Sequence, residues 1–117
     1  MNTFNKVEIV VKALDDKKAF DIKVIKIDDL TILGDYFIIA SGSSSTQVKA
    51  LADIVDEKLS ENGIEPNHIE GKTSGWILLD YGDVVIHVFS KDEREFYSLE
   101  KLWQDGKEID ISDIISK

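Results

Sequence analysis

The sequence predicts an α/β fold: a single small domain in which helices flank a mixed β-sheet. Segments with apolar residues at helical spacing alternate along the chain with short apolar runs that have the period of a strand. One expected helix falls between two pairs of strands, and a crossover through a helix lets a strand return parallel to an earlier one. The length of 117 residues suits one domain and can bury a core without disulfides or metal.

Three segments are expected to be helical, near 3–14, 44–62 and 91–104. The second of them has clear boundaries. Ser44 with Gln47 three residues later is a capping-box pattern, and Asn62-Gly63 is a C-terminal stop. The apolar residues between these boundaries fall on one helical stripe: Val48, Leu51, Ala52, Val55 and Leu59. This pattern predicts a helix that packs one side against the sheet.

Four segments are expected to be strands of one sheet, near 21–27, 36–41, 76–81 and 84–89. Lys23 and Lys26 indicate that the first of them lies at an edge of the sheet. The segment 64–75 is rich in turn formers and is interpreted as a loop. We assign residues 1–106 to the domain and residues 107–117 to a C-terminal tail, which is either an added edge strand or a loose end.

The segment 76–89 is the most informative part of the chain. It contains two apolar runs joined by a turn at Gly82, which indicates a β-hairpin. Both faces of this hairpin are apolar, whereas an antiparallel pair with one solvated face alternates apolar with polar residues. On the first strand, Trp76 and Leu78 share one face and Ile77 shares the other with Leu79. Each face must therefore be covered, by the domain's own helices or by a partner protein.

Composition narrows the classes of function. The chain has no cysteine, which excludes a disulfide framework, a thiolate zinc site and a cysteine nucleophile. It shows no secretory signal and no membrane-spanning run, so we expect a cytoplasmic protein without a membrane partner. The net charge of −9 argues against holding a nucleic acid by counterion release. An acidic surface suits solubility and a basic protein partner.

The serine-rich segment 41–45 lies at a strand-to-helix junction, where a helix N-terminus offers donors to a phosphate. It lacks the Gly-Lys-Ser/Thr ending of a P-loop, and helix capping explains its serines. Nucleotidyltransferases place two metal-binding carboxylates in an Asp-x-Asp/Glu pattern shortly after a Gly-Ser turn. The acids at that distance, Asp53, Asp56 and Glu57, lack this spacing and lie in an expected helix. We predict no metal bound jointly by these three, no nucleotide transfer and no cofactor.

The remaining polar candidates also have structural explanations. Asp80 and Asp83 flank the hairpin turn, where Asx-type hydrogen bonds are favoured over metal binding. His87 lies among aliphatic residues, which suits a structural or interface histidine better than a general base. Trp76 follows a loop, and its position is compatible with a place in the core or at a protein interface. No nucleophile-elbow spacing is present, so we assign no catalytic residue and no metal ligand.

Several ordered blocks make the chain similar to a known family. The blocks are residues 35–42, 44–48, 70–71, 76–89 and 94–103. Between about residues 7 and 103 they resemble the ribosomal silencing factors, also called the Iojap family. The resemblance implies an α/β fold related to nucleotidyltransferases without the catalytic carboxylates, in agreement with the missing Asp-x-Asp/Glu pattern. The tail lies outside the resemblance.

The resemblance implies binding rather than catalysis. Family members bind large-subunit ribosomal protein fourteen where the small subunit docks, so they block subunit joining and repress translation under nutrient limitation. The implied contact surface centres on the hairpin 76–89, near one end of its exposed surface. The residues expected to contact the partner are Trp76, Leu78, Asp80, Tyr81, His87 and Phe89. Contact with nearby ribosomal RNA is expected without a dedicated nucleic-acid site.

Two alternatives remain open from the sequence. The first is a small nucleotidyltransferase-like enzyme that acts on a nucleotide, which a thermal-shift titration with nucleotide and Mg²⁺ would reveal. The second is a homodimer in which the spare sheet face pairs with itself, which light scattering would detect.

Overall fold

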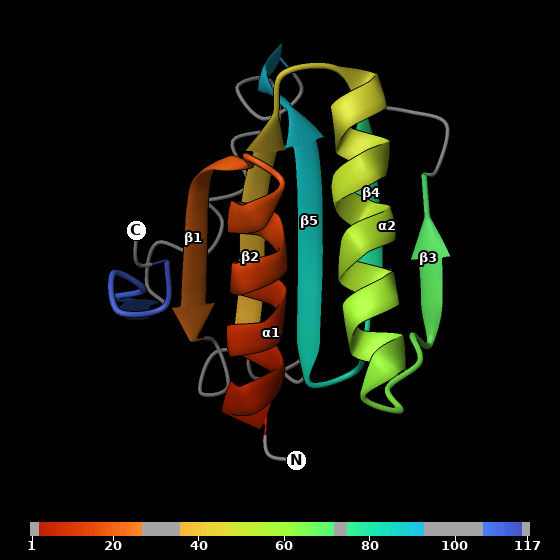
Figure 1. The fold of residues 1–117 in the computed structure, drawn as a ribbon. Helices are drawn as coiled ribbons and strands as arrows, with labels where there is room; N and C mark the ends of the chain where they lie inside the picture. The colour runs from red at the N-terminus through yellow and green to blue at the C-terminus, as the bar shows by residue number, and fades with distance from the viewer. Residues whose placement is uncertain (1–2, 27–35, 72–74, 93–106, 116–117) are drawn as a thin grey trace.

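The computed structural model describes residues 3–26, 36–71, 75–92 and 107–115. Within these residues, six strands form one sheet in the order β3-β4-β5-β2-β1-β6, and two helices lie side by side on one of its faces (Figure 1). The helices are α1 (Thr3–Asp16) and α2 (Ser45–Glu61). The strands are β1 (Phe20–Lys26), β2 (Tyr36–Gly42), β3 (His68–Glu70), β4 (Trp76–Asp80), β5 (Val84–Ser90) and β6 (Lys107–Ile109). Most of the helix expected near 91–104 lies outside the described residues.

The sheet is mixed, as predicted. Strands β2 and β5 pair in parallel, from Tyr36 opposite Val84 to Gly42 opposite Ser90. Every other pairing in the sheet is antiparallel, including the β4–β5 hairpin. Because α2 follows β2 directly, the chain crosses over one face before it returns to the centre of the sheet. The α/β fold class is therefore confirmed.

Helix α2 has the boundaries that its capping residues predict. The Ser44 hydroxyl accepts a hydrogen bond from the Gln47 backbone N–H at 3.1 Å, which satisfies one free donor of the first turn. The Gln47 side chain then bonds Ser43 and the carbonyl of Lys17, and so ties this helix start to the end of α1. At the other end, Gly63 adopts a φ of +77°, a left-handed conformation that ends a helix at low cost in a glycine.

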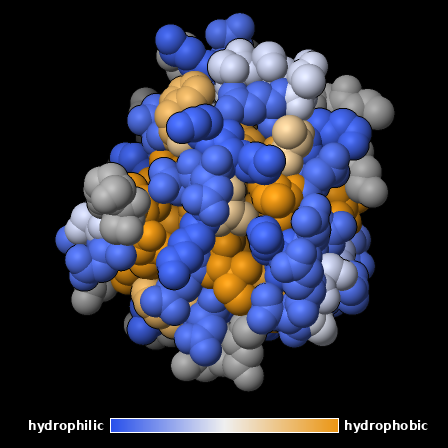
Figure 2. Space-filling view, viewed as in Figure 1, coloured by the Kyte–Doolittle hydropathy of each residue, from blue (hydrophilic) through white to orange (hydrophobic). Residues whose placement is uncertain are grey.

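The helices cover one face of the sheet with a continuous core. The inward residues of α1, including Val7, Val10 and Leu14, are fully buried against it. The outward sides of both helices are largely hydrophilic, with apolar residues visible between them (Figure 2). The sheet residues in this core include Ile38, Ala40, Ile77, Leu79, Ile86 and Val88. A second, smaller cluster contains Ile25, Phe37, Ile39 and Phe89, so both faces of the hairpin are apolar as expected.

Two features of the sheet differ from the sequence prediction. The segment 64–75, interpreted as a loop, contains the short strand β3, which pairs with β4. Strand β1 is not an edge strand at its C-terminal end, because β6 pairs with it from Val24 to Lys26. The residues 107–109 thus form the added edge strand, and Ile111 beyond them joins the core. Among the described residues, no helix is long and apolar enough to cross a membrane.

Candidate partner-binding surface

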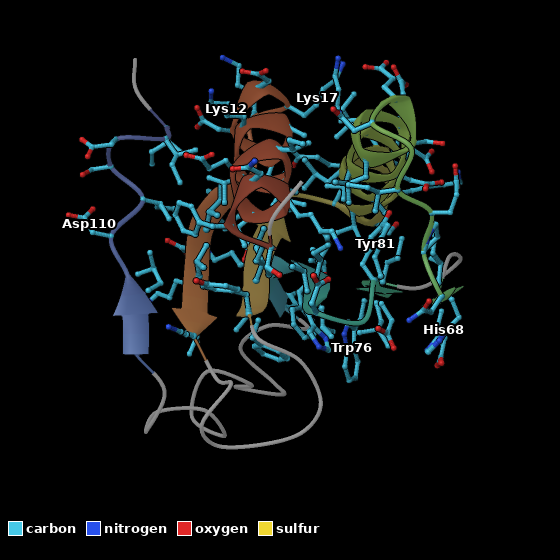
Figure 3. All side chains as sticks on the ribbon, turned by 90° about the horizontal axis from the view of Figure 1, so that it is seen from below. Lys12, Lys17, His68, Trp76, Tyr81 and Asp110 are labelled. Atoms are coloured by element: carbon cyan, nitrogen blue, oxygen red, sulfur yellow. The ribbon has the colours of Figure 1, made fainter. Side chains whose placement is uncertain are left out.

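The face of the sheet turned away from the helices, here called the outer face, is built by strand register. Residues directly opposite one another on neighbouring strands point to the same face. Glu70 of β3 lies opposite Leu78 of β4, which lies opposite His87 of β5. Trp76 lies opposite Phe89 in the next row. In Figure 3, the side chains of Trp76 and His68 accordingly lie on the side of the sheet opposite the helices.

Trp76 is held in place by an aromatic cluster on this outer face. Its indole Nε1–H donates to Nδ1 of His87 at 2.9 Å, and its ring stacks on Phe89 with centroids 5.0 Å apart. The ring of Phe37 packs against the imidazole of His87, with the two centroids 4.6 Å apart, and so joins the cluster. Burial lowers the pKa of His87 from 6.5 to about 4. The imidazole is therefore neutral near pH 7, with Nδ1 as the acceptor that the indole requires.

Beside Trp76 the outer face contains a hollow of about 340 Å³. Among the described residues, its lining consists of Glu70, Gly71, Trp76 and Leu78. Trp76 and Leu78 are half-buried and form the apolar part of this lining, whereas Glu70 is exposed and supplies a carboxylate. The described part of the lining thus combines an aromatic wall, an aliphatic wall and a carboxylate.

At the sheet edge, a histidine lies between two carboxylates, one of which is the Glu70 carboxylate that lines the hollow. His68 Nε2 lies 3.0 Å from the Glu70 carboxylate, and His68 Nδ1 lies 3.7 Å from the Asp80 carboxylate. The second Asp80 oxygen accepts a hydrogen bond from the backbone N–H of Gly82 at 2.8 Å. That Asx-type contact confirms Asp80 as a turn-capping residue.

Asp83 has a different role from the turn cap predicted for it. Its carboxylate accepts hydrogen bonds from Thr3 at 2.8 Å and from Lys6 at 3.0 Å, which ties the hairpin turn to the start of α1. Burial alone would raise the pKa of Asp83, but the bonds from Lys6 and Thr3 outweigh it and the pKa is lowered. Within the described part of the chain, no three histidine or acidic side chains are grouped so that they could hold a metal.

The expectation that Tyr81 lies on the exposed outer surface is wrong. Tyr81 is 6 % exposed and packs in the core on the helix side, where its hydroxyl donates to Asp56 at 3.4 Å (Figure 3). Burial first, and then the negative charge of Asp56, raise the pKa of Tyr81 well above its usual range. The physical reason is strand alternation, because the residue after Asp80 points to the opposite face.

His87 and Phe89 lie on the outer face but are not exposed as expected. They are 8 % and 0 % exposed, because they form the floor beneath Trp76 rather than the surface itself. Trp76, Leu78 and Asp80 are the predicted contact residues that remain accessible. Their contact with a partner stays a prediction. Sequence reasoning missed His68 and Glu70, although Glu70-Gly71 was among the recognised sequence blocks.

The residues considered for nucleotide chemistry are engaged separately. A Cβ at Gly42 would lie 3.2 Å from Val48, so the close packing of α2 on β2 accounts for this glycine. Asp53 forms an ion pair with Lys49 on the exposed side of α2, whereas Asp56 accepts from Tyr81 on its buried side. Asp53 and Asp56 are therefore engaged by different partners.

Fold and surface together define a small α/β domain that presents one preorganised sheet face. The family model described as "Ribosomal silencing factor during starvation" matches residues 1–117. The chain is 43% identical over 112 residues to the ribosomal silencing factor RsfS of Bacillus subtilis, which covers 95% of each chain. It is 36% identical over 109 residues to the chloroplastic protein Iojap of Arabidopsis thaliana, covering 87% of this chain and 43% of that protein.

Solved structures give the same result. A crystal structure of a Chromobacterium violaceum protein matches with a TM-score of 0.87 at 40% identity, over 89% of this chain and 88% of that one. A crystal structure of a Bacillus halodurans protein matches with a TM-score of 0.82 at 38% identity, over 92% and 99%. The chain belongs to the family of ribosomal silencing factors, as its sequence blocks predicted.

Proposed function

We propose that this protein binds the large ribosomal subunit through large-subunit ribosomal protein fourteen and thereby blocks joining of the small subunit. Membership of the silencing-factor family supports a ribosomal target. The observation that carries the choice of surface is the half-buried Trp76 beside the hollow on the outer face. Tryptophan is enriched at the centres of protein interfaces, where it fills a pocket and loses contact with water.

The proposed contact residues are Trp76, Leu78 and Asp80, with His87 and Phe89 as support beneath the indole. Tyr81 contributes only from the helix side, by holding the end of β4 against α2. A net charge of −9 supports a basic protein partner. The same charge disfavours ribosomal RNA as the main contact, because RNA phosphates would repel it.

The proposed mode of action is steric. A domain seated on the subunit-joining face occupies space that the small subunit needs, so translation in the cytoplasm is repressed without any chemical step. The separate engagement of Asp53 and Asp56 supports this reading over a nucleotidyltransferase. We propose accordingly that the protein is not an enzyme and uses no cofactor.

The test is to truncate the proposed anchor and measure subunit joining. Wild-type protein added to purified subunits should increase free subunits in a sucrose gradient and lower the output of cell-free translation. Cutting an interface-centre tryptophan to alanine costs on the order of 2–4 kcal/mol, and 2 kcal/mol corresponds to roughly thirty-fold in affinity. Trp76→Ala should therefore bind large subunits about thirty-fold more weakly and lose both effects.

Phe4→Ala is the matched control, because Phe4 is a half-buried aromatic residue of α1, on the opposite side of the sheet from the hollow. This variant should bind and inhibit like the wild type. A folded Trp76→Ala protein that still inhibits fully would show that the interface is elsewhere. Wild-type protein that leaves subunit joining unchanged would refute the proposed function itself. Light scattering on the same samples tests the homodimer, in which a second copy would occupy the outer face.

A further inference from the structure

We propose that the hollow on the outer face receives an arginine side chain of the protein partner, between the Trp76 indole and the Glu70 carboxylate. This inference rests on the proposed function, because it names the chemistry that the docking surface would recognise. It assigns a recognition role to Glu70, a residue of the edge strand β3 that forms one wall of the hollow.

The shape of the hollow suits a single long side chain. Strand register places Glu70 directly opposite Leu78. Trp76 lies two residues before Leu78, on the same face of β4. Gly71 also lines the hollow and has no side chain to place in it. At about 340 Å³ the hollow lies at the lower end of the volumes typical of ligand sites. It therefore accommodates one inserted side chain rather than a helix or a strand.

The charges around the hollow select a cation. Glu70 lines it, and Asp80 lies on the other side of His68 from Glu70. Among the described residues of this region, Glu70 and Asp80 thus place two carboxylates at or near the hollow. The side chain of Glu70 is 67% exposed, so its carboxylate can turn toward an incoming group. An anionic side chain would be repelled by this carboxylate, and a purely apolar one would form no charge-assisted hydrogen bond with it.

The aromatic wall favours arginine over lysine. A guanidinium group is planar, stacks on an indole face and can pair with a carboxylate through two parallel hydrogen bonds. Its aliphatic stem can pack on Leu78 while its head reaches Glu70. Because His87 and Phe89 already fix the indole, little side-chain freedom is lost when the guanidinium stacks on it. An ammonium group provides the charge without the planar stacking.

The first test measures binding of purified large subunits at about 50 mM and about 200 mM salt. Glu70→Gln should bind about tenfold more weakly than wild type at the lower salt, with a smaller loss at the higher salt. Glu57→Gln is the matched control, because Glu57 is an exposed acid of α2 on the helix side and should leave binding unchanged. If Glu70 and Trp76 act on one arginine, adding Glu70→Gln to Trp76→Ala should cost less than the product of the single losses.

The second test needs no ribosome. Arginine amide, titrated against the protein, should shift the NMR signal of the Trp76 indole Nε1–H in wild type and much less in Glu70→Gln. Lysine amide should give a smaller shift at equal concentration, and Trp76→Phe identifies the signal. The inference would be overturned, without affecting the proposed function, by any of three results. These are equal NMR shifts with the two amides, no shift with arginine amide, or an equal loss of large-subunit binding in Glu70→Gln and Glu57→Gln. Wild-type protein that does not bind large subunits at all would instead overturn the proposed function.

Discussion

Lowering the pH from about 7 to about 5 should destabilise this protein through His87. Burial holds the pKa of His87 at about 4, against 6.5 in its ordinary state. Between these two values the unfolded chain binds a proton that the native protein does not, so stability is lost as the pH falls through this window. The linkage relation gives a loss of about 2 kcal/mol by pH 5 and about 3 kcal/mol once the pH is below 4.

The assay is urea unfolding, followed by circular dichroism, of the wild type and of His87→Gln at both pH values. Glutamine keeps an oxygen that can accept from the Trp76 indole but cannot titrate. Other titrating groups are common to both proteins, so the wild type should lose about 2 kcal/mol more than the variant between the two pH values. Equal losses in the two proteins would refute the reasoning, because His87 would then not be held neutral beneath Trp76.

Two further predictions concern how the layers are joined. Asp83→Asn should lower the free energy of unfolding by about 1–2 kcal/mol near pH 7, because it removes the half-buried ion pair with Lys6. Because the native pKa of Asp83 is lowered, this difference in the free energy of unfolding should shrink in urea titrations as the pH falls through the native pKa. The control is Asp53→Asn, which removes an exposed ion pair and should change stability by less than about 0.5 kcal/mol. Gly42→Ala should cost about 1–3 kcal/mol in thermal unfolding, because its Cβ would meet Val48 at 3.2 Å; an unchanged melting temperature would contradict this.

Sequence patterns correctly predicted those structural elements whose ends are set by interactions between residues close in sequence. Ser44 and Gly63 placed the ends of α2 to within about a residue, because caps and left-handed turns depend on neighbours in sequence. The elements that were missed depend on distant partners. Strand β3 is three residues long and exists through its pairing with β4. Strand β6 lies far along the chain from β1, so no property of Lys23 or Lys26 could reveal that β1 would be covered.

The candidate surface shows the same division. Alternation along β4 correctly placed Trp76 and Leu78 on one face, and it would also have placed Tyr81 on the opposite face had it been continued past Asp80. The burial of His87 could not be predicted in this way. It depends on the direction in which the Trp76 side chain turns, and that direction is set by a hydrogen bond across two strands.

The parallel pairing of β2 with β5 has a consequence for how the chain reaches its native state during synthesis. These two strands form the centre of the sheet, yet α2, β3 and β4 lie between them in the sequence. When β2 leaves the ribosome, its central partner has not yet been made, and closing this long loop carries an entropic cost before any contact rewards it. Until β5 arrives, Ile38 and Ile39 present apolar surface on opposite sides of an unpaired strand edge. The nascent chain is therefore most exposed to aggregation in the interval between the synthesis of β2 and that of β5.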